Sequence, residues 1–153
     1  MQGYVPVEIL TKKYVKAYIT SSLGEKPVME KSSLIGQKLY DLLSHQTNER
    51  LDQFSSKHYT EKLRIYIPIR TFRVRGSFLN HTNIKNLNLF IEALIKERFY
   101  NIMDDLTSVL PSFEANLPEA RRRLGIDIED WADDSMQKDY YRYRLRTGKP
   151  SLR

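Results

Sequence analysis

The chain has 153 residues, with 25 lysines and arginines against 19 aspartates and glutamates, a formal net charge of +6 and 41% hydrophobic residues. This length suits one globular domain with a buried core, which argues against wholesale disorder, a collagen-like repeat or a membrane bundle. Because the sequence has no cysteine, disulfides, thiolate metal sites and a cysteine nucleophile are excluded.

The first residues show no basic leader followed by an apolar core and a cleavage site, as a secretory signal would. No apolar run approaches the roughly 20 residues that cross a bilayer. A cytoplasmic protein without a membrane partner is therefore expected.

Two helices are predicted in the first part of the chain. Residues 6–23 place apolar side chains at helical spacing, and Gly24 is suited to end that helix. Ser32 or Ser33 then caps a second, short helix. The polar stretch that follows, residues 45–62, is expected to be a surface loop with one helical turn or a mobile insert.

Residues 62–79 carry the strongest strand signal, because β-branched and aromatic residues alternate there with polar ones. The apolar positions are odd as far as Ile69 and even from Phe72, and this change of parity predicts a turn or bulge between them. Pro68 lacks an amide hydrogen, so it marks an edge strand or an interruption. The segment is therefore expected to fold on itself as a small antiparallel ribbon.

The longest predicted helix starts at Thr82 or Asn83 and runs to Leu110, where Pro111 closes it. Its apolar residues step by three and four along one broad face, which indicates the buried spine of the fold. The alternative is that part of this face is a seam between two copies of the chain.

Short helices are expected after the spine, from 118 to 124, around Trp131 and from 135 to 146. These elements predict a mostly helical α+β fold with a long central helix and a small antiparallel ribbon. The expected domain organisation is a helical core of residues 1–110 and a C-terminal helical appendage of residues 111–153 packed on that core.

The charged residues are concentrated in blocks. Residues 61–75 hold five basic side chains and one acidic one, and residues 138–153 hold six basic side chains and one acidic one. Between them, residues 124–137 hold five acidic side chains and no basic one. This acidic block either neutralises the basic tail or leaves it free for a polyanion.

The first candidate nucleic-acid surface is the basic strand region, because cations on the polar side of a ribbon can follow phosphates along a major groove. The alternative is a solvated sheet face whose charges protect the edge. The side chains concerned are Lys62, Arg64, Arg70, Arg73 and Arg75.

The second candidate surface is the last helix, where basic and aromatic residues are interleaved in a way that suits phosphate contacts with base or sugar stacking. The alternative is that the tyrosines pack on the spine while the cations complement the helix dipole. The candidate contacts are Lys138, Tyr140, Arg142, Tyr143, Arg144 and Arg146.

A further segment has the spacing of the turn in a helix-turn-helix motif, at Ala120, Leu124, Gly125 and Ile126. The segment resembles that family, and the resemblance implies DNA binding through a second helix capped by Asp127. That second helix would hold four carboxylates and no cation, so a structural cap at Gly125 is the alternative. The stretch 111–146 is also similar to small uncharacterised proteins of bacterial prophages and mobile elements.

No catalytic constellation is evident, because the histidines lack metal-ligand spacing and no glycine loop suits phosphate. A non-enzymatic chain without metal or cofactor is expected. The favoured function is a DNA-binding accessory or regulatory protein of phage or mobile-element origin, with nucleic acid or an acidic protein as its partner. The alternative is an assembly, adaptor or phage structural protein that uses the charged C-terminal blocks between molecules, a homodimer included.

Overall fold

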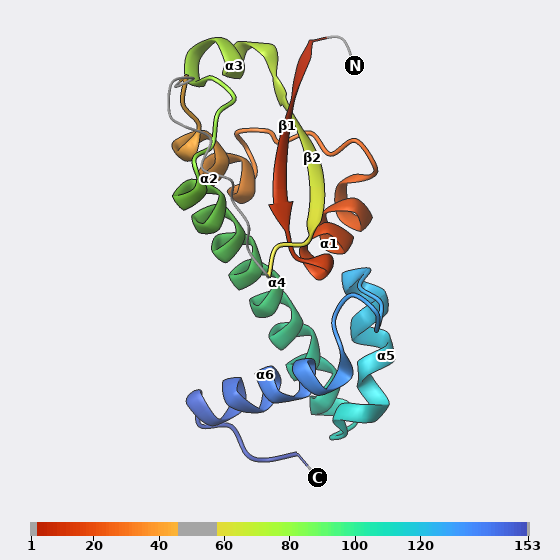
Figure 1. Cartoon of the computed structure of the whole chain (residues 1–153). Helices are drawn as coiled ribbons and strands as arrows, with labels where there is room; N and C mark the ends of the chain where they lie inside the picture. Colours follow the sequence, from red (N-terminus) through yellow and green to blue (C-terminus); the bar gives the residue numbers. More distant parts are fainter. Residues whose placement is uncertain (1–2, 46–57, 153) are drawn as a thin grey trace.

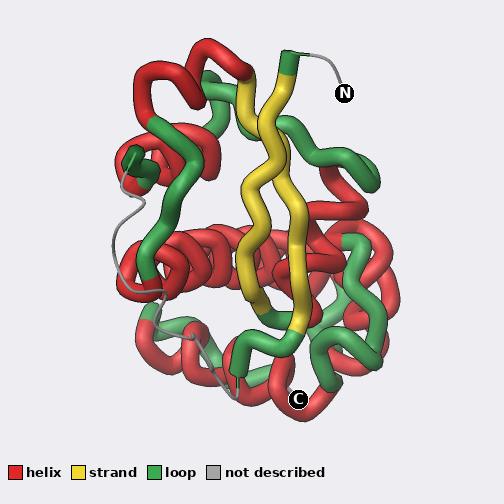
Figure 2. Tube along the Cα trace, turned by 45° about the horizontal axis from the view of Figure 1, so that its top comes forward, coloured by secondary structure: helices red, strands yellow, loops and turns green. Residues whose placement is uncertain are grey.

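The computed structural model describes residues 3–45 and 58–152, and most of the predicted polar loop lies outside these residues. The fold is mostly helical α+β, as expected, with a long central helix and a two-stranded antiparallel sheet (Figures 1 and 2). In chain order the elements are β1 (Tyr4–Thr11), α1 (Lys13–Leu23), α2 (Leu34–Leu42), β2 (Glu61–Pro68), α3 (Ile69–Arg75), α4 (His81–Val109), α5 (Phe113–Leu124) and α6 (Asp133–Arg146).

The sheet differs from the expected ribbon. β2 pairs with β1, so that Val7 lies opposite Ile65, and the segment after Pro68 forms α3 instead of a returning strand. The prediction of a ribbon within 62–79 was therefore wrong, although the interruption at Pro68 is confirmed. The change of parity arises because the chain leaves the sheet as a helix, which needs no pairing partner.

The predicted helix over 6–23 was also wrong in its first half. Residues up to Thr11 form β1, and α1 begins at Lys13. In β1 alternate side chains are buried, at Val7, Ile9 and Thr11, which is the period of a strand. In Figure 1 the two strands lie beside the first half of α4, and in Figure 2 no helix covers the side of the strands that faces the viewer.

α4 is the spine that the sequence predicts. Asn80 caps it by accepting a hydrogen bond from the Asn83 amide, and its apolar stripe is buried within the chain, including Leu87, Ile95 and Phe99 at 0% exposure. One continuous apolar cluster joins the inner face of the sheet to side chains from α1, α2, α4, α5 and α6. The burial of the stripe inside one chain favours the core interpretation over the dimer seam.

A buried polar cluster fixes the corner between β1 and α1 against α4. The Lys12 ammonium lies 2.6 Å from Glu92 Oε1, and the Tyr14 hydroxyl donates to the same oxygen at 2.7 Å. Nearby, Asn88 donates to the Leu10 carbonyl at 2.8 Å and accepts from the Thr11 hydroxyl. Burial, followed by the bond to Glu92, raises the pKa of Tyr14, so this hydroxyl stays protonated as a donor.

Two C-terminal elements begin earlier than predicted. α5 starts at Phe113, where Ser112 accepts a hydrogen bond from the Ala115 amide, and Pro118 lies inside the helix. α6 starts at Asp133. The helical stretch expected around Trp131 is instead a turn, with the Trp131 side chain buried and stacked on Tyr14 at 4.8 Å between ring centroids.

The turn after α5 yields a stability prediction. Gly125 has φ +69°, and a Cβ there would lie 2.4 Å from the Ser21 side chain of α1, whereas Gly148 has φ +71° with nothing within 4 Å. Left-handed strain costs a non-glycine residue about 1 to 2 kcal/mol. We expect Gly125→Ala to lower the free energy of unfolding in urea by more than this, because α1 must also move. Gly148→Ala is the matched control, because it introduces the backbone strain without a steric clash. An equal loss of unfolding free energy in the two variants would contradict the close packing of Gly125 against Ser21.

Candidate nucleic-acid interface

The two basic segments lie far apart. α3 is close to the start of α4, and α6 crosses the C-terminal half of α4, so the two helices stand at opposite ends of the molecule in Figure 1. The cations of α3 and α6 therefore form two separate surfaces rather than one continuous face.

The cations of β2 are partly neutralised. Lys62 and Arg64 project from the open face of the sheet, and Glu8 of β1 lies 4.0 Å and 3.6 Å from them. These exposed pairs contribute little stability, but the carboxylate reduces the positive potential of the sheet face. The sheet alone is a poor surface for a polyanion.

The three arginines of α3 point in different directions. Arg70, Arg73 and Arg75 are exposed and form no ion pair within the described residues. Steps of three and two residues turn about 300° and 200° around a helix, so they do not form a row. Arg70 and Arg75 line a hollow between α2 and α3 that also contains Glu30 and Asp41.

α6 places two of its predicted contacts inside the protein. Tyr140 is 0% exposed and Arg144 is 9% exposed, so neither side chain lies on the outer face of the helix. The Tyr140 hydroxyl donates to Asp104 Oδ1 of α4 at 2.8 Å, and the Arg144 guanidinium donates to that hydroxyl at 3.0 Å and to the Pro150 carbonyl at 2.9 Å. Their burial contradicts the expectation that both side chains are exposed on a nucleic-acid surface, because both residues hold α6 and the tail in place.

Tyr143 belongs to the same cluster. Its hydroxyl donates to Asp104 Oδ2 at 2.6 Å, its ring stacks on Tyr100 at 4.4 Å, and the Lys149 ammonium also contacts Asp104. Burial alone raises the pKa of Asp104, but the hydrogen bonds from Lys149, Tyr143 and Tyr140 together outweigh it and hold the pKa below its usual range. We call Asp104, Tyr140, Tyr143, Arg144 and Lys149 the Asp104 cluster.

The outer face of α6 keeps three free cations. Lys138, Arg142 and Arg146 are exposed and form no ion pair within the described part of the chain. Intervals of four residues keep them within about 80° of one another over roughly 12 Å of helix. We call these three residues the α6 row. It is an aligned set of cations, which α3 does not provide.

The acidic block does not cover this row. It forms the turn before α6 and the first residues of the helix, at the end opposite to Arg142 and Arg146. Asp133 accepts a hydrogen bond from Arg121 at 2.5 Å, and no residue of 127–134 pairs with a described residue of 138–152. The basic end of α6 therefore remains free.

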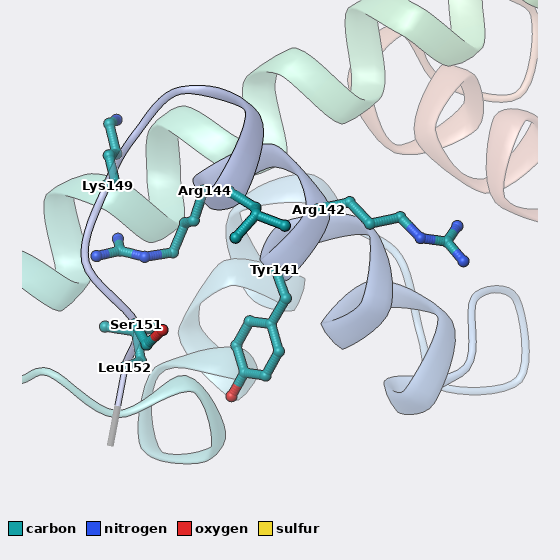
Figure 3. A pocket seen from close by; sticks show the side chains of 7 residues that line it. Tyr141, Arg142, Arg144, Lys149, Ser151 and Leu152 are labelled. Carbon is teal, nitrogen blue, oxygen red and sulfur yellow. The ribbon is translucent and has the colours of Figure 1, made fainter.

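A cleft lies between α6 and the returning tail. Local sequence patterns do not predict it, because the tail must fold back onto α6 to form it. Figure 3 shows its lining, in which Arg142 and Arg144 extend to opposite sides of the helix. Two exposed side chains here, Tyr141 and Leu145, were not predicted as site residues. Only a helical projection, which places them beside Arg142, could have indicated them.

The helix-turn-helix resemblance is not matched by a second helix at the expected place. Ala120, Leu124 and Ile126 are buried and Gly125 is left-handed, but residues 128–130 form a turn and the next helix begins at Asp133. The Arg121 guanidinium holds this turn by donating to the Trp131 carbonyl at 2.7 Å. The alternative, a structural cap at Gly125, describes the segment.

Within the described residues, no group of three or more histidines, aspartates and glutamates could hold a metal ion. In the same part of the chain, none of the helices contains an apolar stretch of the length that spanning a bilayer requires. Comparison with protein-family models, with curated proteins and with solved structures gives no match.

The Asp104 cluster predicts a pH-dependent contribution to stability. We expect Asp104→Asn to lower the free energy of unfolding by about 2 to 3 kcal/mol at neutral pH, since charged hydrogen bonds are removed. A lowered carboxyl pKa contributes stability above about pH 4, and this contribution disappears as the pH falls through the folded-state value. Urea titrations of wild type and variant should therefore converge at low pH.

Asp105→Asn is the control, because Asp105 is the exposed neighbour on the same helix. It should leave stability nearly unchanged. A deficit of Asp104→Asn that stays constant as the pH falls would contradict the role of the charged carboxylate.

Proposed function

We propose that the chain is a non-catalytic nucleic-acid-binding protein with an accessory or regulatory role, and that the α6 row contacts the phosphates. The observation that carries the proposal is the alignment of three exposed, unpaired cations on one side of a helix whose opposite side is fixed by the Asp104 cluster.

The chemistry of the row suits a phosphate backbone. Cations that neutralise phosphates release condensed counterions, which supplies most of the affinity of sequence-independent binding. A row of roughly 12 Å spans about three or four nucleotides at 3.4 Å per nucleotide of one strand. The Asp104 cluster holds the inner face of α6 in place, so the helix need not become ordered when the cations bind phosphate. This lowers the entropy cost of binding.

Fluorescence anisotropy with labelled DNA and RNA at several salt concentrations tests this function. We expect binding at about 50 mM salt that weakens steeply as salt rises. Replacing the α6 row together, with Lys138→Gln, Arg142→Gln and Arg146→Gln, should weaken binding to every sequence. It should also reduce the salt slope by about one for each phosphate that is no longer neutralised.

The matched control removes the same charge from the other end of the molecule, with Arg70→Gln, Arg73→Gln and Arg75→Gln. This control should keep most of the affinity. Equal losses of affinity in both triple variants would show that net charge alone binds the strand. Absence of binding by the wild-type protein at about 50 mM salt would overturn the proposal.

The surface of α3 favours a second function, assembly of copies of this chain. Thr71 is the only buried residue of this helix, while Phe72 and Val74 are 37% and 73% exposed between the arginines. Arginine and aromatic residues are enriched at protein interfaces. The turn before α6 offers a complement, because Ile128 is 58% exposed among the acidic residues Asp127, Glu129 and Asp130.

Charge reversal tests this assembly, because a contact between two different patches can be broken from either side. We expect the solution mass, measured by light scattering, to fall to that of a monomer in Arg73→Glu and in Glu129→Arg. Mixing the two variants should restore an assembly, since the reversed charges attract. A wild-type protein that stays monomeric at all concentrations would exclude the second function.

A further inference from the structure

The cleft between α6 and the tail combines an apolar interior with a cationic rim. It has a volume of about 280 Å³, and its apolar lining comes from Tyr141, Leu145 and Leu152. Arg142, Arg144 and Lys149 supply its cations, and the side chains of Arg142 and Arg144 extend to opposite sides of α6 (Figure 3). None of the described residues that line the cleft carries a carboxylate, so the cleft suits a flat apolar group next to negative charge.

The Tyr141 ring is held in place with room for a partner. It meets Phe113 of α5 in edge-to-face geometry at 6.0 Å between centroids, and its hydroxyl accepts a hydrogen bond from Gln137 at 3.2 Å. The residue is nevertheless 41% exposed. An aromatic ring that is supported on one side and exposed on the other is the platform on which single-stranded binding proteins stack bases.

The opposite wall of the cleft is built by specific contacts. The Arg144 guanidinium donates through two nitrogens to the Pro150 carbonyl, and Leu152 packs against the apolar core. Arg144 and Lys149 both contact the single carboxylate of Asp104, so one positive charge remains in excess beside the cleft. The tail therefore forms a wall with a net attraction for anions.

We propose that this cleft receives an unpaired base of a single-stranded nucleic acid, stacked on Tyr141, while the α6 row holds the neighbouring phosphates. The inference rests on the proposed function and deepens it by naming the substrate as a single strand. Arg142 belongs to both the row and the cleft lining, so one nucleotide can place its phosphate on the row and its base in the cleft. The paired bases of a duplex are stacked inside the helix and cannot enter.

Binding of oligothymidylate and of a blunt duplex, measured by anisotropy, tests the inference. We expect the single strand to bind more tightly than the duplex. Tyr141→Ala should weaken single-strand binding about 5- to 150-fold, the range for removal of one stacked base, with the salt slope and duplex binding unchanged. Tyr141→Phe should retain the affinity, because stacking needs only the ring. Oligouridylate in parallel distinguishes RNA from DNA as the source of the strand.

Tyr66→Ala on the open face of the sheet is the matched control and should bind like wild type. If the α6-row variant loses binding but Tyr141→Ala does not, the proposed function stands and the base-binding cleft is wrong. If Tyr141→Ala weakens single strand and duplex equally, the cleft is again wrong. Binding of a poly-glutamate peptide that disappears in Tyr141→Ala, with no binding of either nucleic acid, would assign the cleft to acidic proteins and overturn the inference.

Discussion

The carboxylate of Asp104 ties α6 and the tail to the spine helix α4. It is a half-buried anion on the spine, and two tyrosine hydroxyls from α6 and the ammonium of Lys149 converge on it. Without this anion the hydroxyl of Tyr140 and the guanidinium of Arg144 would be buried with too few partners, which is costly. Asp104 therefore connects α6 and the tail at one point, while the bonds from Arg144 to the Pro150 carbonyl complete the wall of the cleft.

The same interaction divides the charges of α6 into two sets. The cations on the inner side contact Asp104 and the Pro150 carbonyl, and those on the outer side form no ion pair with the described residues. Neither the net charge of +6 nor a count of charges by segment reveals which cations of α6 are paired inside the protein. Free positive charge at a binding surface is what remains after the internal pairs are removed.

Much of the fold could be predicted from local sequence. The spine helix, its end before Pro111, the helix capped by Ser33 and the interruption at Pro68 all depend on neighbouring residues, and all are present. β1 could not be predicted in this way. Its pairing partner lies more than fifty residues away, and Leu10 and Tyr14 have the spacing of a helix although the first belongs to a strand.

The candidate site was predictable only in part, for a related reason. A helical projection of 133–146 separates Lys138 and Arg142 from Met136 and Tyr140, so the exposed row could be found. The burial of Arg144 could not, because it depends on an aspartate 40 residues earlier in the chain and on a tail that folds back. The turn at 128–132 was hidden as well, since Arg121 and the buried Trp131 hold it through contacts that spacing does not reveal.

The small size of the α6 row limits what a single chain can do. In the proposed function three cations would neutralise about three phosphates, which would give a salt slope near −2 on a single strand and an affinity in the range of non-specific binding. Two chains joined by α3 and the acidic turn would leave each α6 row open, because neither contact includes the basic end of α6. Linked sites raise the overall affinity through effective concentration without any new contact. The two proposed functions would therefore support one another, since a weak site on each chain would become a strong one along a strand only when copies are held together.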